Sequence, residues 1–464
     1  MNLLESSHRQ YRQTLILGLI YSCEELFPQE QLKIAYSISD GIYCEFENSL
    51  VSVREVNHIE EHLKTWVKSD QSLAFQLEGD SFFHCKVNEK KIKSLFPPLP
   101  RSGPIYPFRL IHYPPGFILL FSNPNQPETL SPFIPPEKLT ATFRETQRWG
   151  ENLHLAEVED VNRIIQEHHS QELICLAEAL HEKKVSLIAD RILEQRKNVR
   201  IILISGPSSS GKTTFAQRLS TQLRVNGLRP VALSLDNYFC DREDTPKDAD
   251  GHPDFEALEA LDLPLLNRHL QALIQGGDIE CPIYDFESGR RKPYVQKMKL
   301  SADEILVMEG IHGLNPRLLS SLDRNHLFRI YVSALFQLNI DSYNRIPTTE
   351  VRLIRRLVRD DKFRGISPEN TLLQWASVRR GENTNIFPYQ EEADVMFDSS
   401  LLFELNALRP YAEPLLITVP QEHPHYSTAV HLLRLLSHFN PLDISKVPFN
   451  SLLREFIGGG IYSY

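Results

Sequence analysis

The second half of the chain alternates between short apolar runs and longer segments with helical periodicity. Strands that are apolar at nearly every position, with helices between them, indicate a parallel sheet covered on both faces. From residue 200 onward the β-type runs are "RIILIS", "PVALSL", "EILVME", "FRIYVS" and "PLLITV". The pattern therefore predicts an α/β fold for this half, with a parallel sheet and helices on both of its faces.

The first 150 residues follow a different pattern. Short β-like runs such as "LKIAYSI" and "GFILLFS" alternate with turns, and proline-rich stretches interrupt the chain at 96–107 and 123–138. We expect an α+β fold here. Residues 155–196 then become helical, because apolar side chains recur near a 3.6-residue spacing at Ile174, Ala177, Leu180, Ile188 and Ile192.

These changes in pattern predict three parts of the chain. They are an α+β domain at 1–150, connector helices at 151–197, and an α/β domain with a C-terminal extension at 198–464. The connector helix is expected to pack on the second half. A fragment beginning near Glu151 is therefore expected to stay soluble.

Composition limits the partners and the location. Hydrophobic residues make up 41% of the chain, charged residues 24%, and the net charge of −10 argues against general binding to nucleic acid or anionic membranes. No apolar run approaches the roughly 18 residues of a membrane span, and the N-terminal sequence lacks the order of a signal peptide. A cytoplasmic protein is expected. The six cysteines form no C-x-x-C pair, so neither a disulfide framework nor a zinc site is expected.

The stretch "GPSSSGKTT" has the spacing of a phosphate-binding loop. It lies between the run "RIILIS" and a segment with helical spacing, so its backbone N–H groups and the helix N-terminus can surround a phosphate. Lys212 would meet the β- and γ-phosphates of ATP, and the Thr213 hydroxyl would bind Mg²⁺. The residues predicted to contact the nucleotide are Gly206, Ser208, Ser209, Ser210, Gly211, Lys212, Thr213 and Thr214.

Two further predicted strands end in carboxylates. "SLDNYF" places Asp236 beyond the second strand, where a general base could take the proton of an acceptor hydroxyl. "EILVMEG" ends in Glu309, which could hold Mg²⁺ at the same sheet edge. The N-K-x-D segment of regulatory GTPases is absent from the sequence. These features favour an ATP-dependent phosphotransferase.

Arginines recur at helical spacing further along the chain. Arg352, Arg355, Arg356 and Arg359 stand at i, i+3, i+4 and i+7 and would line one helix face. Like charges on one face repel unless anions neutralise them. The pattern favours a lid that closes over phosphates, with a solvated helix face as the alternative.

Taken in order, these motifs resemble the uridine kinase and phosphoribulokinase family through most of residues 200–400. Within this family, the chain most resembles the branch of nucleoside kinases that carry an extra N-terminal domain. The segments "EALHEKKVSLIAD" and "VPFNSLLREFIGG" also resemble that branch. The family motifs are "GPSSSGKTTF", "SLDNYF", "DGHPDFEALEALD", "CPIYDFESGRRK", "VMEGIHGLN", "RLIRRLVRD" and "ADVMFDSS".

The resemblance implies a role for each matched position. Asp236 matches the catalytic base, and Thr213 and Glu309 match the magnesium ligands. Asp254 is the counterpart of a carboxylate that binds ribose hydroxyls, and Tyr284 of an aromatic residue at the base or ribose. Arg356, Arg359 and Arg364 match the lid cations. Arg359 and Arg364 are assigned to catalysis with Lys212, and Arg356 is assigned to the substrate site with Gln374.

The sequence departs from the family at one acceptor position. Gly289 stands where kinases of the uridine–cytidine type can place a histidine against the base, which leaves the pyrimidine preference open. His252 could substitute for it, although a solvated loop histidine is the simpler interpretation.

Residues 10–46 resemble the second N-terminal domain of threonyl-tRNA synthetases. That resemblance implies a similar fold. Gln13 and Leu17 occupy the positions of the paired histidines of that domain, so neither metal ligation nor editing chemistry is expected.

The combined hypothesis is an ATP- and Mg²⁺-dependent kinase that phosphorylates the 5′-hydroxyl of a nucleoside such as uridine. Phosphoribulokinase and pantothenate kinase activities are the enzymatic alternatives. An ATP-sensing, RNA-binding or regulatory protein is the alternative of another class, and it would need a basic, aromatic-rich N-terminal surface. The expected partners are a nucleoside and ATP, without membrane or nucleic acid; the oligomeric state, including a homo-oligomer, stays open.

Overall fold

The computed structural model describes residues 3–79, 81–123, 126–248, 251, 253–285, 288–319 and 322–462. Two compact units emerge from the contacts within the chain. Unit 1 combines Met1–His168, Phe336–Pro347 and Pro420–Pro441, and unit 2 combines His169–Leu335, Thr348–Val419 and Leu442–Tyr464.

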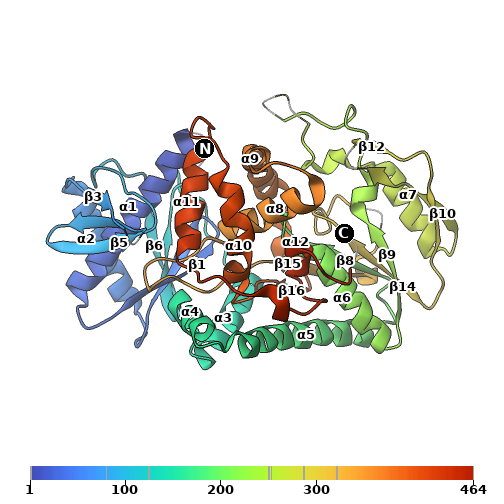
Figure 1. The fold of residues 1–464 in the computed structure, drawn as a ribbon, viewed down its shortest axis with the longest axis horizontal. Helices are drawn as coiled ribbons and strands as arrows, with labels where there is room; N and C mark the ends of the chain where they lie inside the picture. Colours follow the sequence, from blue (N-terminus) through green and yellow to red (C-terminus); the bar gives the residue numbers. More distant parts are fainter. Residues whose placement is uncertain are drawn as a thin grey trace. The chain divides into compact units, whose positions relative to one another are not determined.

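Unit 1 has an α+β architecture (Figure 1). Its first sheet is antiparallel with the order β1-β2-β7-β6, and a second antiparallel sheet has the order β3-β4-β5. The strands are β1 (Leu32–Ile38), β2 (Gly41–Phe46), β3 (Ala74–Leu77), β4 (Phe83–Val87), β5 (Lys90–Ser94), β6 (Arg109–Tyr113) and β7 (Gly116–Leu120). The helices are α1 (Leu3–Leu26), α2 (Val53–Lys68), α3 (Glu137–Asn152), α4 (Val158–Gln166) and α11 (Tyr426–Ser437).

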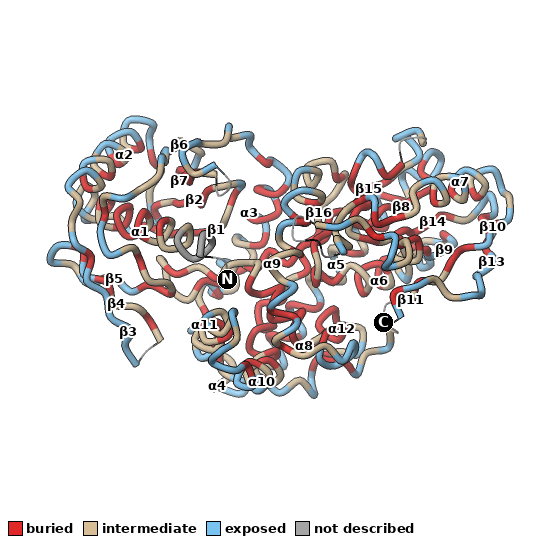
Figure 2. The backbone as a smooth tube through the Cα atoms, turned by 90° about the horizontal axis from the view of Figure 1, so that it is seen from above, coloured by how far each residue is buried: buried red, intermediate tan, exposed pale blue. Residues whose placement is uncertain are grey.

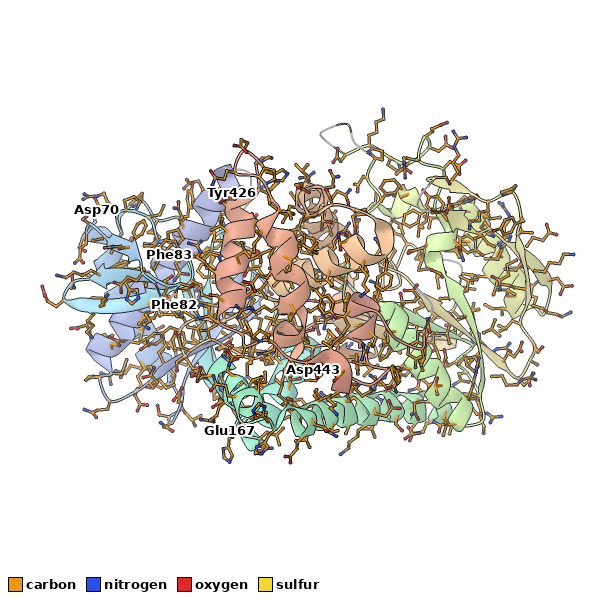
Figure 3. The ribbon with its side chains drawn as sticks, in the orientation of Figure 1. Asp70, Phe82, Phe83, Glu167, Tyr426 and Asp443 are labelled. Carbon is orange, nitrogen blue, oxygen red and sulfur yellow. The ribbon has the colours of Figure 1, made fainter. Side chains whose placement is uncertain are left out.

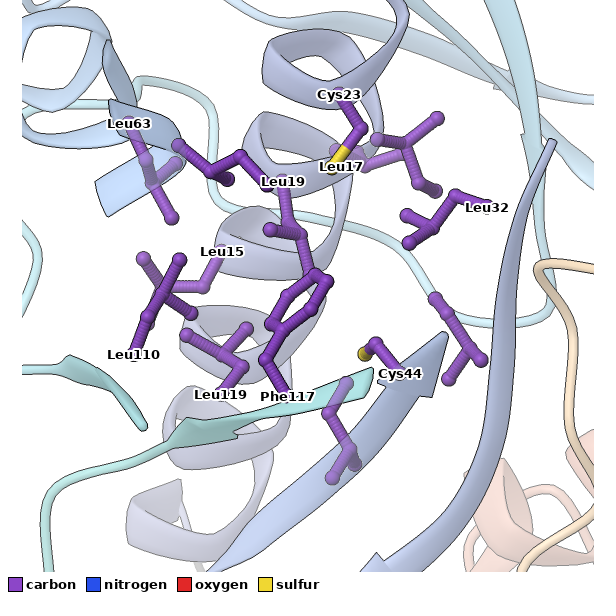
Figure 4. Close-up of a cluster of buried hydrophobic side chains, with 14 of the residues drawn as sticks. Leu15, Leu17, Leu19, Cys23, Leu32, Cys44, Leu63, Leu110, Phe117 and Leu119 are labelled. Carbon is purple, nitrogen blue, oxygen red and sulfur yellow. The ribbon is translucent and has the colours of Figure 1, made fainter. Parts of the chain in front are cut away.

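The core of unit 1 lies between α1, α2 and the first sheet. Leu15 and Leu19 of α1 pack in one cluster with Phe117 and Leu119 of β7 (Figure 4). Leu17, at one of the two positions aligned with synthetase histidines, is fully buried in this cluster. It therefore contributes to packing. The likeness of this region to threonyl-tRNA synthetases stays a prediction.

A segment close to the end of the chain also belongs to unit 1. The ring of His431 on α11 stacks on Phe96, with 4.3 Å between ring centroids. The Arg434 guanidinium lies 5.0 Å from the centre of the Phe83 ring, and His438 contacts Phe82 (Figure 3 labels both phenylalanines). These contacts explain why residues 420–441 group with the first 168 residues.

Unit 2 contains the predicted parallel sheet. Its order is β16-β15-β8-β14-β9, and all four pairings are parallel. Every residue of β8 is buried, as is most of β14 and β15 (Figure 2). Because successive side chains of a strand point to opposite faces, both faces of the sheet are covered. The strands are β8 (Ile201–Ser205), β9 (Arg229–Ser234), β14 (Glu304–Glu309), β15 (Leu327–Ser333) and β16 (Val395–Asp398).

The remaining elements of unit 2 include helices and two small hairpins. The helices are α5 (Ser170–Glu194), α6 (Lys212–Val225), α7 (Leu263–Ile274), α8 (Thr348–Arg364), α9 (Pro368–Asn385), α10 (Glu404–Ile417) and α12 (Arg454–Ile457). The hairpin strands are β10 (Asp278–Cys281) with β13 (Gln296–Lys299), and β11 (Tyr284–Asp285) with β12 (Arg290–Arg291).

One predicted strand is wrong. The run "PLLITV" does not join the sheet, because Pro414–Ile417 form the end of helix α10. The fifth strand is instead β16, at the preceding "VMFD". A short apolar run cannot be assigned to a strand or to a buried helix by periodicity alone, and here the run belongs to a helix whose residues pack in the core.

The predicted packing of the connector helix is confirmed. Arg218 of α6 donates to Glu178 at 3.2 Å and to Glu182 at 2.8 Å, and both carboxylates lie on α5. Figure 1 shows α5 running beside α6. The proposed division at residues 150 and 197 stays a prediction about folding units.

Candidate phosphoryl-transfer site

Three strands of the parallel sheet end at one edge of unit 2. Glu309, the last residue of β14, is in register with Ser234 on β9 and with Ile204 on β8. The Ser234 hydroxyl donates to Glu309 Oε1 at 3.1 Å and accepts the N–H of Asp236 at 3.3 Å. The two carboxylates predicted from the strand ends are therefore joined through one serine.

The phosphate loop follows β8 at the same edge. A Cβ on Gly206 would lie 1.9 Å from the Val332 carbonyl oxygen, so a side chain there would collide with β15. Ser209 and Gly211 adopt left-handed backbone conformations, with φ of 58° and 83°. Gly211 caps the N-terminus of α6. The loop thus curls as a phosphate cradle requires, with the N-terminus of α6 behind it.

Two buried hydroxyls in the loop fit an anionic ligand. The Oγ atoms of Ser209 and Ser210 are buried and make no hydrogen bond within the described part of the chain. Buried hydroxyls without a partner cost free energy. The Lys212 ammonium donates to the Pro207 carbonyl at 3.0 Å, on its own loop. These groups have the chemistry needed to contact phosphate oxygens.

Charges of both signs surround the loop. Burial lowers the pKa of Lys212, while Glu309 and Asp236 oppose the shift. Burial also raises the pKa of Asp236, with Lys212 and Arg364 opposing. The pKa of Glu309 rises to about 7, first through burial and then through its proximity to Asp236. Two neighbouring carboxylates of this kind are stabilised by an added cation.

The oxygen atoms that could hold Mg²⁺ come from Thr213 and Glu309. Thr213 is the second residue of α6, next to Lys212, and is partly exposed. Mg²⁺ prefers oxygen ligands, keeps several waters and uses few protein groups. In the described ranges, no group of three or more His, Cys, Asp or Glu residues could bind a metal ion. The residues present fit a cation shared with substrate phosphates.

The first two arginines of α8 are structural. Arg352 pairs with Glu382 of α9 and donates to the Ser208 carbonyl at 3.0 Å. Arg355 donates to Glu404 at 2.8 Å and to the Ser209 carbonyl at 3.3 Å. Both side chains are at most 2% exposed. Both arginines bind carbonyl groups of the phosphate loop. The expectation that all four arginines belong to a lid is therefore wrong for Arg352 and Arg355.

The next arginines of this segment surround Asp360. Its buried carboxylate accepts from Arg356 Nε at 3.1 Å and from Arg359 Nη2 at 3.1 Å, and Arg364 Nη1 lies 3.5 Å away. Arg356 also donates to the Ser208 hydroxyl at 2.9 Å and to Gln374 at 3.3 Å. The charges of Arg359 and Arg364 both lower the pKa of Asp236 and so oppose the effect of burial. Asp360 therefore gathers the cations beside the predicted base.

The predicted acceptor residues Tyr284 and Asp254 both belong to unit 2. Tyr284 donates its N–H to the Asn237 side chain at 3.3 Å, and its ring contacts Phe239. Asp254 accepts the N–H of Glu256 at 3.1 Å. Gly289 has a φ of 69°, and a Cβ there would meet the Arg242 side chain at 2.5 Å. His252 lies outside the described residues.

Sequence reasoning missed several carboxylates of this site. Burial and Glu382 raise the pKa of Glu256 to about 7, and its Oε2 makes no hydrogen bond within the described ranges. Glu256 lies in the quoted motif "HPDFE", so the motif was a signal for it. Glu382 and Glu404 had no such signal. Glu382 also accepts the N–H of Ser208 at 3.0 Å.

Comparison with known proteins gives one family. The model described as "Phosphoribulokinase / Uridine kinase family" matches residues 201–402. The uridine kinase of Deinococcus deserti is 33% identical over 197 residues, covering 42% of this chain and 86% of that protein. The uridine kinase of Brevibacillus brevis is 29% identical over 201 residues, covering 43% of this chain and 84% of that protein.

Solved structures that are similar to this chain include other kinases. The D-glycerate 3-kinase of Cryptococcus neoformans has a TM-score of 0.31 and 18% identity, covering 45% of this chain and 89% of that chain. Within the described residues, no helix is long and apolar enough to cross a membrane. The motifs at the sheet edge and the match to the uridine kinases lead to one conclusion: the chain belongs to the phosphoribulokinase / uridine kinase family and is a P-loop kinase.

Proposed function

We propose that this kinase transfers the γ-phosphoryl group of ATP to the 5′-hydroxyl of a nucleoside such as uridine, in a reaction that requires Mg²⁺. One observation carries the proposal: Asp236 follows β9 at the edge of the sheet, where Ser234 joins it to Glu309, and the charges of Lys212, Arg359 and Arg364 act on it. A carboxylate beside cations and a phosphate loop suits proton removal during phosphoryl transfer. Uridine kinases among the relatives favour a nucleoside.

The transfer needs each group in a defined role. Asp236 takes the proton of the acceptor hydroxyl. The oxygen of that hydroxyl forms a bond to the γ-phosphorus, while the bond between the γ-phosphorus and the β–γ bridging oxygen breaks and ADP leaves. Lys212, Arg359 and Arg364 balance the negative charge on the transferred group. Thr213 and Glu309 would hold Mg²⁺, which would supply positive charge to the substrate phosphates.

Asp254 and Tyr284 are the proposed acceptor contacts. A carboxylate can accept two hydrogen bonds from the 2′,3′-diol of a ribose, and an aromatic ring can pack on the sugar or base. Arg356 and Gln374 are assigned to the same side of the site, where they contact each other. Because Gly289 departs from the base-contacting histidine, the base is the least constrained part of the proposal.

The alternatives to this proposal are two other acceptors and a non-catalytic role. Ribulose 5-phosphate would require a second phosphate site, and pantothenate would require its own cleft. Membership of the kinase family argues against the alternative of another class, an ATP-sensing, RNA-binding or regulatory protein. Location in the cytoplasm, independence of nucleic acid and any homo-oligomer stay predictions.

A panel of acceptors tests the proposal. The purified protein is incubated with ATP and Mg²⁺, with each ribonucleoside, ribulose 5-phosphate or pantothenate, and ADP and phosphorylated product are measured. We expect 5′-phosphorylation of at least one nucleoside, loss of turnover without Mg²⁺, and no product with Lys212→Ala. Product from ribulose 5-phosphate or pantothenate, with none from any nucleoside, would contradict the proposal.

A further inference from the structure

The C-terminal segment, residues 442–462, lies outside the family match yet contacts the phosphate loop within unit 2. Residues 451–458 are all buried. Leu452 covers Gly211, since a Cβ there would lie 2.5 Å from its Cδ2. The Phe456 ring lies 5.0 Å below the Arg355 guanidinium, which in turn donates to the Ser209 carbonyl. The segment is therefore part of the wall of the loop.

One side chain of this segment binds the first turn of α6. Glu455 Oε2 accepts the N–H of Thr214 at 3.2 Å and its hydroxyl at 2.8 Å. Thr214 is the third residue of the helix. Glu455 is only 6% exposed, and its charge raises the pKa of both Lys212 and Glu309. A carboxylate thus holds two donors at the positive end of the helix behind the loop.

Phosphate groups use donors of the same kind. The N-terminal N–H groups of a helix and its partial positive charge attract an anion, whether it is a carboxylate or a phosphate. Two anions cannot share the same two donors without repulsion and loss of hydrogen bonds. We propose that Glu455 is an internal anion that occupies the Thr214 part of the nucleotide site and has to release Thr214 when ATP binds. This inference rests on the proposed binding of ATP at the phosphate loop.

The release involves the Glu455 side chain, because the adjacent backbone is fixed. Arg454 donates to the Val447 carbonyl at 2.6 Å and to the Gly458 carbonyl at 3.2 Å, which ties α12 to the segment before it and to the residue that follows it. The main chain around Glu455 therefore stays in place while its carboxylate turns away. Glu455 makes ATP binding weaker than the loop alone would allow, because it accepts hydrogen bonds from the two Thr214 donors.

Neutral and shortened variants test the proposal by the sign of their effect. Glu455→Gln keeps the size of the side chain and removes the charge, so the full-length variant should bind ATP–Mg²⁺ about tenfold more tightly in calorimetry, the scale of one charge-assisted hydrogen bond. Inorganic tripolyphosphate, which lacks base and ribose, should show the same gain. The matched control is Asp443→Asn, which makes the same charge change in this segment at a side chain that caps Ser445 (Figure 3).

The outcomes are distinguishable. Equal or weaker ATP binding by Glu455→Gln, or an equal gain in Asp443→Asn, would overturn the proposal. If Glu455→Gln does not fold, Glu455→Asp replaces it: its shorter carboxylate cannot reach Thr214, so tighter binding supports the proposal and unchanged binding overturns it. If the unmodified protein binds no ATP, and Lys212→Ala behaves identically, the proposed function itself fails. If the unmodified protein binds ATP and the Glu455 variants bind it no more tightly, the inference about Glu455 fails and the proposed function does not.

Discussion

Asp360 accepts two hydrogen bonds from Arg359, from Nε at 3.3 Å and from Nη2 at 3.1 Å. The same carboxylate also contacts Arg356 and Arg364, and it accepts the Thr371 hydroxyl at 3.4 Å. It is completely buried. One carboxylate therefore fixes the directions of three guanidinium groups beside Asp236, and the next residue along the chain, Asp361, is exposed.

Replacing Asp360 should impair both stability and turnover. Removing one partner of a buried ion pair costs about 3–5 kcal/mol because the remaining charges stay uncompensated. Asp360→Asn should therefore lower the thermal unfolding midpoint and reduce kcat by more than about tenfold through misdirected arginines, with a smaller change in KM for ATP. The exposed Asp361→Asn is the control. A folded Asp360→Asn protein with a kcat close to that of the unmodified enzyme would remove Asp360 from the account.

A buried histidine predicts a loss of stability in acid. His181 of α5 contacts the Ser400 carbonyl through Nε2 at 2.9 Å, and burial lowers its pKa to about 3. Below about pH 6.5 the unfolded chain binds a proton that the folded protein does not, so stability falls as the pH decreases toward that lowered pKa. His181 alone should remove about 2–3 kcal/mol of stability by about pH 4.5.

The variant His181→Gln tests this dependence, because it can keep a donor to Ser400 but cannot gain a charge. Thermal unfolding midpoints are compared at neutral pH and at about pH 4.5, with the exposed His58→Gln as control. We expect a smaller acid-induced decrease in His181→Gln than in the control. Equal decreases in the two variants would show that His181 does not contribute to acid sensitivity.

The acceptor proposal predicts a preference for ribose. A carboxylate that accepts hydrogen bonds from both hydroxyls of the ribose loses one of them with a 2′-deoxynucleoside, so deoxynucleosides should have a kcat/KM at least about tenfold lower. Asp254→Ala should abolish most of that preference and raise KM for the nucleoside while ATP binding stays unchanged. Asp278→Ala, which removes an exposed carboxylate paired with Lys299, is the control. Unchanged nucleoside kinetics in Asp254→Ala would exclude the assignment.

The composition of unit 1 predicts the behaviour of a truncated chain. Without residues 1–150, Asn344 loses its hydrogen bonds to Lys93 and Leu95, Asn339 loses its bond to Ile34, and α11 loses its contacts with β4. A fragment beginning near Glu151 should therefore be recovered mainly in the insoluble fraction, contrary to the expectation from sequence. Soluble expression followed by size-exclusion chromatography, with the full chain alongside, makes the comparison. A soluble, monodisperse fragment would show that residues 336–347 and 420–441 do not need residues 1–150.

The parallel sheet and the phosphate loop could be predicted because they depend on local patterns. Apolar runs mark β8 and β14, and the glycines of the loop have fixed spacing. Glu404 could not be predicted as a partner of the site, because it reaches it through tertiary contacts across a long stretch of sequence. Glu455 lies in the quoted run "VPFNSLLREFIGG", but no local pattern shows that it contacts Thr214. The arginine spacing correctly indicated one helix, but which arginines are buried depends on Glu382 and Glu404, whose positions no local pattern reveals. In the same way, nothing in residues 420–441 indicates that they pack with unit 1.

Turnover of Asp236→Asn tests the central claim most directly. The amide keeps the shape of the side chain but cannot accept the proton of the acceptor hydroxyl, so kcat for nucleoside phosphorylation should fall by about 10²–10⁴-fold, or roughly 3–5 kcal/mol of barrier. ATP affinity, measured by calorimetry on the same preparation, should change little because Lys212 and the loop are intact. A nucleoside kinase activity within about threefold of the unmodified enzyme would contradict the account.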